Sequence, residues 1–323
     1  MKIENIFKKL QDIFKKLQDI FKKIFNNNKK TIYILISGGK VTHWFLFIRL
    51  LMYLIDEYNL KIIYNLDNIT KSDIVIPIAI ESQTLLYKNQ IYNIIDNKKL
   101  FYKHIQDNFP DGSDGIYLIP TYENNYEGIN FFSKFIIKPF TGVASKNILF
   151  QEGFIYDIIS KYSNDNQIQD IIKISYTLDV NFGCKDGEII GKCCLKHNKP
   201  QIQTLDYILG FEGKYIDMDK IPKIIFDFCK KIIKNNNYNG FIHFEFIQDN
   251  TGKIYIMECN PRISGGIEHP LYFKHLIEPY INVKSKAIDF FINSTYLDKK
   301  VKRYDHFDFF VEYAKYKFFS YIT

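Results

Sequence analysis

Hydrophobic residues recur at spacings of three and four through the first 25 residues, where the heptad IFKKLQD occurs twice and continues as IFKKIF. In a helix these residues form one apolar stripe, with lysine pairs on the opposite side. The pattern predicts a basic amphipathic helix over residues 1–28. Three interpretations remain open: docking or self-association as a short coiled coil, binding to an anionic membrane surface, and a solvated extension.

The next segment alternates strand patterns with a helical pattern. TIYILISGG at 31–39, KIIYNL at 61–66 and DIVIPIA at 73–79 read as apolar strands, and the stretch from about 43 to 58 reads as a helix. This order predicts an open α/β layer over residues 31–95. The glycine pair after the first strand favours a tight turn over a phosphate-binding loop.

The segment from residue 96 onward mixes both periodicities. Helical patterns occur at 96–109, after an aspartate that can cap the helix, and at 220–236. Strand patterns occur at 135–148 and at 168–194, the latter around a turn at Lys185-Asp186-Gly187. We therefore expect an α+β body after the first layer.

The segment GFIHFEFIQDNTGKIYIMECN predicts a hairpin. If Thr251-Gly252 is a two-residue turn, Glu245 lies opposite Glu258. An even change in loop length keeps both carboxylates on one face, and only an odd loop or a bulge would separate them. Alternate positions of a strand share a face, so four residues of the second strand are expected to point one way: Ile254, Ile256, Glu258 and Asn260.

Glu245, Glu258 and Asn260 would then converge on one patch. Like charges that face each other are destabilising unless a cation lies between them, and oxygen ligands in this number suit Mg²⁺ or Mn²⁺. An exposed cross-strand pair offset by lysines accounts poorly for the whole set, which runs through Asn-Pro-Arg into Ser-Gly-Gly. Arg262 adds a fixed cation for a carboxylate or an acyl phosphate.

Lys138 interrupts the apolar strand FIIKP, and its burial is costly unless it meets an anion. The small residues after it, Gly142 to Ser145, would let backbone amides approach a phosphate. A hairpin whose lysine extends to solvent explains the same pattern equally well. The loop lacks the GKS or GKT ending of a Walker motif, which disfavours a P-loop NTPase.

The charge distribution, the cysteines and the apolar runs disfavour several classes of protein. Of the formal charge of +7, residues 1–30 supply +6, from nine lysines against three acidic residues, so the body gives no indication of a general nucleic-acid-binding surface. Five cysteines without CxxC spacing argue against a disulfide framework and a zinc site. No apolar run suits a membrane span or a signal peptide, so we expect a cytoplasmic protein, with membrane-surface attachment or self-association of residues 1–25 left open.

HFEFIQDNTGKIYIMECNPRISGG resembles the closing hairpin of the ATP-grasp superfamily, which includes biotin carboxylase, carbamoyl-phosphate synthetase and D-alanine:D-alanine ligase. DIVIP, DNKKLFYK, IIKPFTGVASKNI and CKDGEII resemble the earlier landmarks of that family in order. The resemblance implies a mixed α/β and α+β fold: a short Rossmann-like pre-grasp domain at 31–95, an ATP-grasp domain of two lobes at 96–290 and an extension at 291–323.

The resemblance also implies roles for individual residues. ATP would be contacted by Lys98, Lys138, Gly142, Ser145, Asp170 and Ile172, the last two at the hinge beside adenine. Mg²⁺ or Mn²⁺ would be held by Glu245, Glu258 and Asn260. The acyl-phosphate intermediate and the substrate would meet Arg262, Ser264, Gly265 and Gly266. Two departures from the family are Ser175, where a ribose-binding glutamate is frequent, and a phosphate loop whose only glycine is Gly142.

The implied activity is ATP-dependent ligation of a small carboxylate to an amine, through an acyl phosphate and with release of ADP and phosphate. No Ser/His/Asp or Cys/His set in the sequence indicates a protein nucleophile. One alternative is a nucleotide-binding module tethered by its N-terminal helix, which Ser175 and the repeat favour. Another is carboxyphosphate chemistry on bicarbonate, which the motif IEHP at 267–270 suggests.

Overall fold

The computed structural model describes residues 30–36, 58–70, 72–78, 80–109, 115–141, 147–198, 213–216, 218–264 and 275–277. The predicted amphipathic helix at 1–28, most of the helix predicted from 43 to 58, and the extension at 291–323 lie outside these residues. Among the helices that the structure describes, none is long and apolar enough to cross a membrane.

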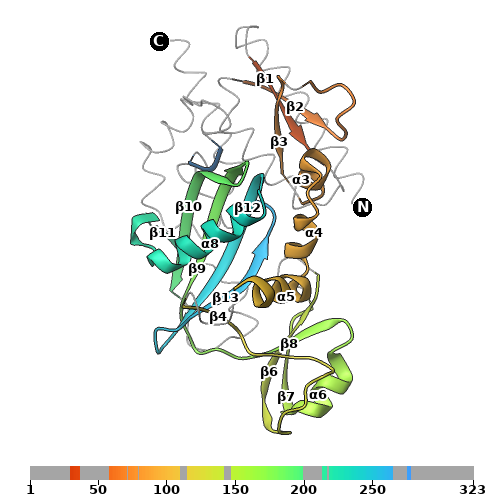
Figure 1. The fold of residues 1–323 in the computed structure, drawn as a ribbon, viewed down its shortest axis with the longest axis vertical. Coiled ribbons are helices and arrows are strands. Elements are labelled where there is room, and N and C mark those ends of the chain that lie inside the picture. The colour runs from red at the N-terminus through yellow and green to blue at the C-terminus, as the bar shows by residue number, and fades with distance from the viewer. Residues whose placement is uncertain are drawn as a thin grey trace, which may run out of the picture.

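The first sheet holds three parallel strands in the order β2-β1-β3: β1 (Lys30–Leu35), β2 (Tyr58–Ile63) and β3 (Ile74–Pro77). Ile32, Ile34 and Ile76 are fully or almost fully buried, as the apolar runs predict. The connection between β1 and β2 lies outside the described residues, so the Rossmann-like character of this layer stays a prediction. Two helices, α3 (Ile80–Tyr87) and α4 (Ile91–Asp96), lead from this sheet to the rest of the molecule (Figure 1).

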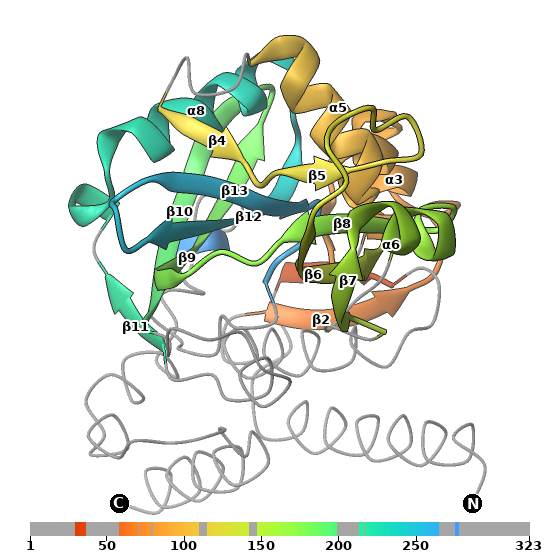
Figure 2. The ribbon, with the colours of Figure 1, turned by 90° about the horizontal axis from the view of Figure 1, so that it is seen from below.

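The central sheet has six described strands in the order β11-β10-β9-β12-β13-β4, all antiparallel to their neighbours except β4, which runs parallel to β13. Their bounds are β4 (Ile116–Leu118), β9 (Ile174–Lys185), β10 (Glu188–Asn198), β11 (Gly213–Ile216), β12 (Gly240–Asp249) and β13 (Ile254–Asn260). The helices α5 (Lys98–Asn108) and α8 (Lys223–Asn235) cover one face, and the short helix η1 (Met218–Lys220) precedes α8 (Figures 1 and 2). Phe182, Phe228, Phe244 and Phe246 lie in the core between helices and sheet.

A smaller lobe contains four strands in the order β5-β8-β6-β7, with α6 (Ile155–Tyr162) packed against them. Its strands are β5 (Thr121–Tyr122), β6 (Phe132–Pro139), β7 (Leu149–Phe154) and β8 (Asn166–Asp170). Phe135, Ile137 and Ile158 form its own core. This lobe lies at the lower end of the view in Figure 1, and residues 171–173 connect β8 to β9 of the central sheet.

The hairpin β12–β13 has a register that differs from the predicted one. The last pair is Gln248–Ile254, so five residues lie between the last paired positions, where the prediction had two. The pairing then shifts by one residue, because a bulge at Met257 precedes the pair Glu245–Glu258. The odd loop and the bulge cancel, and Glu245 lies opposite Glu258 as predicted.

The bulge changes which residues of β13 share a face. Ile254 and Ile256 pack into the core beneath the helices, whereas Tyr255 and Met257 belong to a cluster that also contains Ile247. The prediction that Ile254 and Ile256 share a face with Glu258 is therefore wrong. Met257 is an extra residue in the strand, so the side chains after it point to the opposite face from the one that a strict two-residue period predicts.

The cap of α5 also differs from the prediction. Asn97, not the preceding aspartate, caps the helix, since its side-chain oxygen accepts a hydrogen bond from the Leu100 amide at 3.1 Å. Asp96 is the last residue of α4. The capping places Lys98 in the first turn of α5, where the chain enters the site.

Candidate active site

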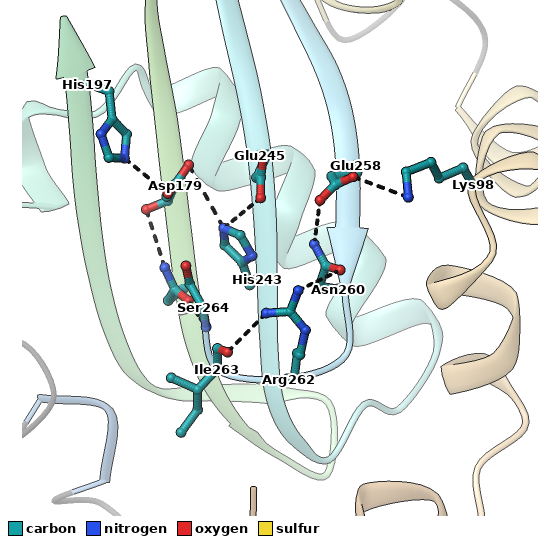
Figure 3. Close-up of polar contacts among 11 residues, drawn as sticks. Lys98, Asp179, His197, His243, Glu245, Glu258, Asn260, Arg262, Ile263 and Ser264 are labelled. Carbon is teal, nitrogen blue, oxygen red and sulfur yellow. Dashed lines mark hydrogen bonds and ion pairs between the residues drawn. The ribbon is translucent and has the colours of Figure 1, made fainter. Parts of the chain in front are cut away.

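Polar side chains cross the face of the central sheet that is turned away from α5 and α8. Residues directly opposite each other in antiparallel strands share a face. Across β13, β12 and β9 the paired positions are Glu258–Glu245–Asp179 in one row and Asn260–His243–Asn181 in the next. Figure 3 shows Glu258 and Asn260, Glu245 and His243, and Asp179 on the three neighbouring strands.

Glu258 lies at the centre of a charged cluster. Its carboxylate is 3.5 Å from the Lys98 ammonium and accepts a hydrogen bond from the Asn260 amide at 2.9 Å. Arg262 donates to the other end of that amide, Asn260 Oδ1, at 3.3 Å. Burial by itself raises the pKa of Glu258, but Lys98, Asn260, Lys138 and Arg262 outweigh it and lower the pKa to about 2. Glu258 is therefore an anion at neutral pH.

Lys138 enters the site from the smaller lobe. It lies on β6 opposite Gln167 of β8, and it is only 6% exposed. Burial lowers its pKa to about 8, Glu258 and Glu245 oppose the shift, and Lys98 adds to it. The amide of Lys98 donates to the Phe140 carbonyl at 2.9 Å, which ties the start of α5 to the end of β6. The two lysines predicted to contact phosphates thus flank the junction between the lobes.

A second cluster lies beside the first. Asp179 Oδ2 is 3.1 Å from His197 Nε2, and the other oxygen is 3.9 Å from His243 Nε2. His243 Nε2 is also 3.6 Å from Glu245 Oε1. Burial by itself raises the pKa of Asp179, but its contacts with the two imidazoles outweigh burial and hold that pKa below its usual range. The two facing glutamates therefore have different neighbours: Glu245 contacts the His243 imidazole, and Glu258 contacts the Lys98 ammonium.

The predicted hinge residues lie where β8 ends. Asp170 accepts a hydrogen bond from the Tyr122 hydroxyl at 3.0 Å, and burial raises the pKa of its carboxyl group although that hydrogen bond opposes the shift. Ile172 packs with Ile119 and Ile174 near the connection between the lobes. An adenine amino group would therefore share Asp170 with Tyr122.

The remaining predicted residues are only partly described. Gly142, Ser145, Gly265 and Gly266 lie outside the described residues. Ser264 is buried, and its amide donates to Asn181 Oδ1 at 3.1 Å. The start of the predicted substrate loop is thereby anchored to β9.

Four residues of this face were not predicted from the sequence: Asp179, Asn181, His197 and His243. One pattern could have indicated His243, because His243 and Glu245 stand two apart in the strand HFEF and so share a face. The other three come from strands far away in the sequence, and only the sheet order brings them alongside. Gln167 was also missed; it is buried, and neither atom of its amide makes a hydrogen bond.

The donor set suits the metal that the sequence predicts. Glu245, Glu258 and Asn260 present carboxylate and amide oxygens from adjacent strands, and Mg²⁺ and Mn²⁺ prefer such ligands. The Asn260 amide already bridges Glu258 and Arg262. To bind a metal ion, Asn260 Oδ1 would either lose its hydrogen bond from Arg262 or accept that bond and bind the ion together.

Comparisons with known proteins give one family match and several similar solved structures. The model of the ATP-grasp domain family matches residues 95–266. Solved structures that resemble the chain include N5-carboxyaminoimidazole synthetase from Staphylococcus aureus, with 14% identity, a TM-score of 0.49 and coverage of 79% of this chain and 78% of that one. D-alanine–D-alanine ligase from Bacillus anthracis has 14% identity, a TM-score of 0.48 and coverage of 82% and 96%.

L-amino acid ligase from Bacillus licheniformis has 12% identity, a TM-score of 0.46 and coverage of 78% and 73%. No curated protein matches the sequence. The family match spans more than half of the 323 residues and includes the hinge, both lysines and the hairpin. The chain therefore belongs to the ATP-grasp family.

Proposed function

We propose that this protein is an ATP-dependent ligase that joins a small carboxylate to an amine through an acyl phosphate. The observation that carries the proposal is the cluster around Glu258, where two lysines, an amide and an arginine from both lobes meet one anionic carboxylate. A site that transfers a phosphoryl group needs fixed positive charge around the phosphate oxygens, and needs no protein nucleophile.

In the proposed reaction, ATP lies between the lobes with its adenine near Asp170 and Ile172. Lys98 and Lys138 contact the phosphates, together with the loop of Gly142 and Ser145. Magnesium bound by Glu245, Glu258 and Asn260 would neutralise phosphate charge as the terminal phosphoryl group moves to the carboxylate. Arg262 holds the acyl phosphate, and residues 264–266 border the substrate.

The geometry supports this assignment in two respects. Lys138 is buried beside Gln167, whose amide makes no hydrogen bond, so that an anion between the lobes would offset the buried charge and give the amide a partner. Glu258 and Asn260 are in contact with Lys98 and Arg262, respectively, which favours a preorganised electrostatic site.

The test is ADP release from Mg-ATP with pooled small carboxylates and amino acids, read beside mass spectrometry of the products. A new amide-sized mass with stoichiometric ADP is expected, and Glu258→Gln should lower the rate at least a hundredfold, since it removes a metal ligand and the partner of Lys98. Glu152→Gln, which changes an exposed carboxylate on β7, is the matched control and should leave the rate unchanged.

Three outcomes would contradict the proposal. ADP release that persists in Glu258→Gln would remove this carboxylate from the reaction. Nucleotide binding without ADP from any pool would favour the tethered binding module, whereas ADP release that requires bicarbonate and forms no amide would favour carboxyphosphate chemistry.

A further inference from the structure

Asp179, His243 and Glu245 form a compact group on the adjoining strands β9 and β12. Each offers one ligand atom, and these atoms all lie within 4.8 Å of one another. The imidazole of His243 lies between the two carboxylates, at 3.9 Å from Asp179 Oδ1 and 3.6 Å from Glu245 Oε1 (Figure 3). A ring nitrogen and two oxygens thus point at a common centre.

The His243 ring has no hydrogen-bond partner among the described residues. It is 2% exposed, and neither of its nitrogens makes a hydrogen bond. Its contacts with the carboxylates are too long for hydrogen bonds. They match the spacing of ligands around an ion, because atoms bound at about 2.1 Å from a metal are separated by about 3 to 4 Å.

His197 supplies the support that metal-binding carboxylates usually have. Its Nε2 contacts the second oxygen of Asp179 at 3.1 Å, and its ring is 1% exposed. A hydrogen bond to the outer oxygen fixes the orientation of a carboxylate ligand and leaves the inner oxygen free to bind. His197 is therefore a positioning residue, and Asp179 is held ready for a cation.

The chemistry of this group differs from that of the nucleotide hairpin. Glu258 turns to Lys98 and Asn260 and lies outside the group. Magnesium prefers oxygen ligands and accepts imidazole reluctantly, whereas Mn²⁺ and its neighbours accept both. Two carboxylates with one imidazole suit Mn²⁺ best among these ions.

We propose that Asp179, His243 and Glu245 bind a divalent transition-metal ion of the Mn²⁺ class, at a site that shares Glu245 with the ion that would accompany ATP. This ion neutralises two buried carboxylates and gives the His243 ring its partner. It also fixes Glu245 next to Glu258, so that the nucleotide site is built on a metal-held strand. The inference does not rest on the proposed ligase reaction.

The experiment uses untagged, nucleotide-free full-length protein at pH 7.5, with Mn²⁺ alone as the probe. Pulsed electron paramagnetic resonance detects a directly bound imidazole as coupling of the Mn²⁺ spin to ¹⁴N. We expect one bound Mn²⁺ per chain with ¹⁴N coupling. His243→Gln should abolish the coupling and weaken binding at least tenfold, while Glu258→Gln, on the same face but outside the group, should retain both.

Circular dichroism checks that the variants fold. If His243→Gln unfolds, Asp179→Asn keeps the side-chain volume and should also weaken Mn²⁺ binding at least tenfold. Bound Mn²⁺ without ¹⁴N coupling in the wild type overturns the proposal, as does coupling that survives in His243→Gln, and so does the absence of Mn²⁺ binding. None of these readouts depends on ADP release, so failure of this site is distinct from failure of the ligase proposal.

Discussion

Lys138 illustrates how burial alters the chemistry of one side chain. Its pKa falls to about 8 in the folded protein, against 10.5 for the ordinary group, chiefly because it is buried. Below pH 8 both states of the protein carry the proton, and the folded state bears the full cost of a buried charge. Between pH 8 and 10.5 the unfolded state binds more protons, so stability rises with pH and the cost of about 3 kcal/mol is relieved.

This cost predicts how Lys138→Met behaves in urea unfolding at pH 7.5 to 10.5. The difference in free energy of unfolding between wild type and variant should move in favour of the wild type as pH rises, by roughly 2 to 3 kcal/mol over the range. Lys134→Met, on the same strand but exposed, is the control, and its difference should stay flat. A flat difference for Lys138→Met as well would show that its charge is not penalised by burial.

At the scale of single residues, the sequence allowed us to predict site residues that are charged but lie in otherwise apolar strands. Lys138, Glu245 and Glu258 stand out because charged groups rarely occur in apolar strands. Asp179 and His197 were harder to interpret, because their partners lie on other strands. Knowledge of the sheet order would have been needed to bring them together with His243.

Among the elements, α3 is linked to the hairpin through the side chain of Gln83. Gln83 is fully buried; its amide nitrogen donates to the carbonyls of Phe241 and Pro261, and its oxygen accepts from the Phe241 amide. Gly240 has a φ of +88°, and a Cβ at that position would collide with the Gln83 side chain. The chain from Asn260 to Arg262 is thus positioned by a helix that precedes the family match.

The hydrogen bonds of Gln83 predict that Gln83→Ala lowers the free energy of unfolding by about 2 to 4 kcal/mol, because buried backbone groups lose their partners. Thr84→Ala, which removes only a hydrogen bond within the same helix, should cost less than about 1 kcal/mol. Urea unfolding measures both. Equal losses for the two variants would contradict the role assigned to Gln83.

The elements themselves were predicted unevenly. Apolar runs predicted β1 and β3, the turn at Lys185-Asp186-Gly187 predicted the strands β9 and β10, and periodicity predicted α8 with Ile225, Phe228 and Ile232 on its buried side. The bulge in β13 and the odd number of residues between the last paired positions could not be predicted, because either one alone would separate Glu245 from Glu258 and only their combination keeps the two opposite each other. The facing of Glu245 and Glu258 was therefore predicted correctly from a register that was wrong in detail.

In the molecule as a whole, the proposed nucleotide site is divided between two lobes. Lys138 and Asp170 belong to the smaller one, whereas Lys98, Glu245 and Glu258 belong to the central one (Figure 1). Residues 171–173 and the bond from the Lys98 amide to the Phe140 carbonyl connect the two. A nucleotide that contacts both lobes would stabilise them relative to each other, in proportion to its affinity for the folded state.

This division predicts where a Mg²⁺-bound ATP analogue slows amide hydrogen exchange. Contacts of the adenine should protect peptides that cover residues 166–174, and contacts of the phosphates and the metal should protect those that cover 256–264. In Glu258→Gln the first protection should persist and the second should fall, since the variant removes a metal ligand and leaves the hinge intact. Peptides from α8, on the face of the central sheet opposite the site, serve as the internal reference. Loss of both protections in Glu258→Gln would mean that the hinge does not bind the nucleotide independently of the hairpin, and protection confined to α8 would place the nucleotide outside the junction of the lobes.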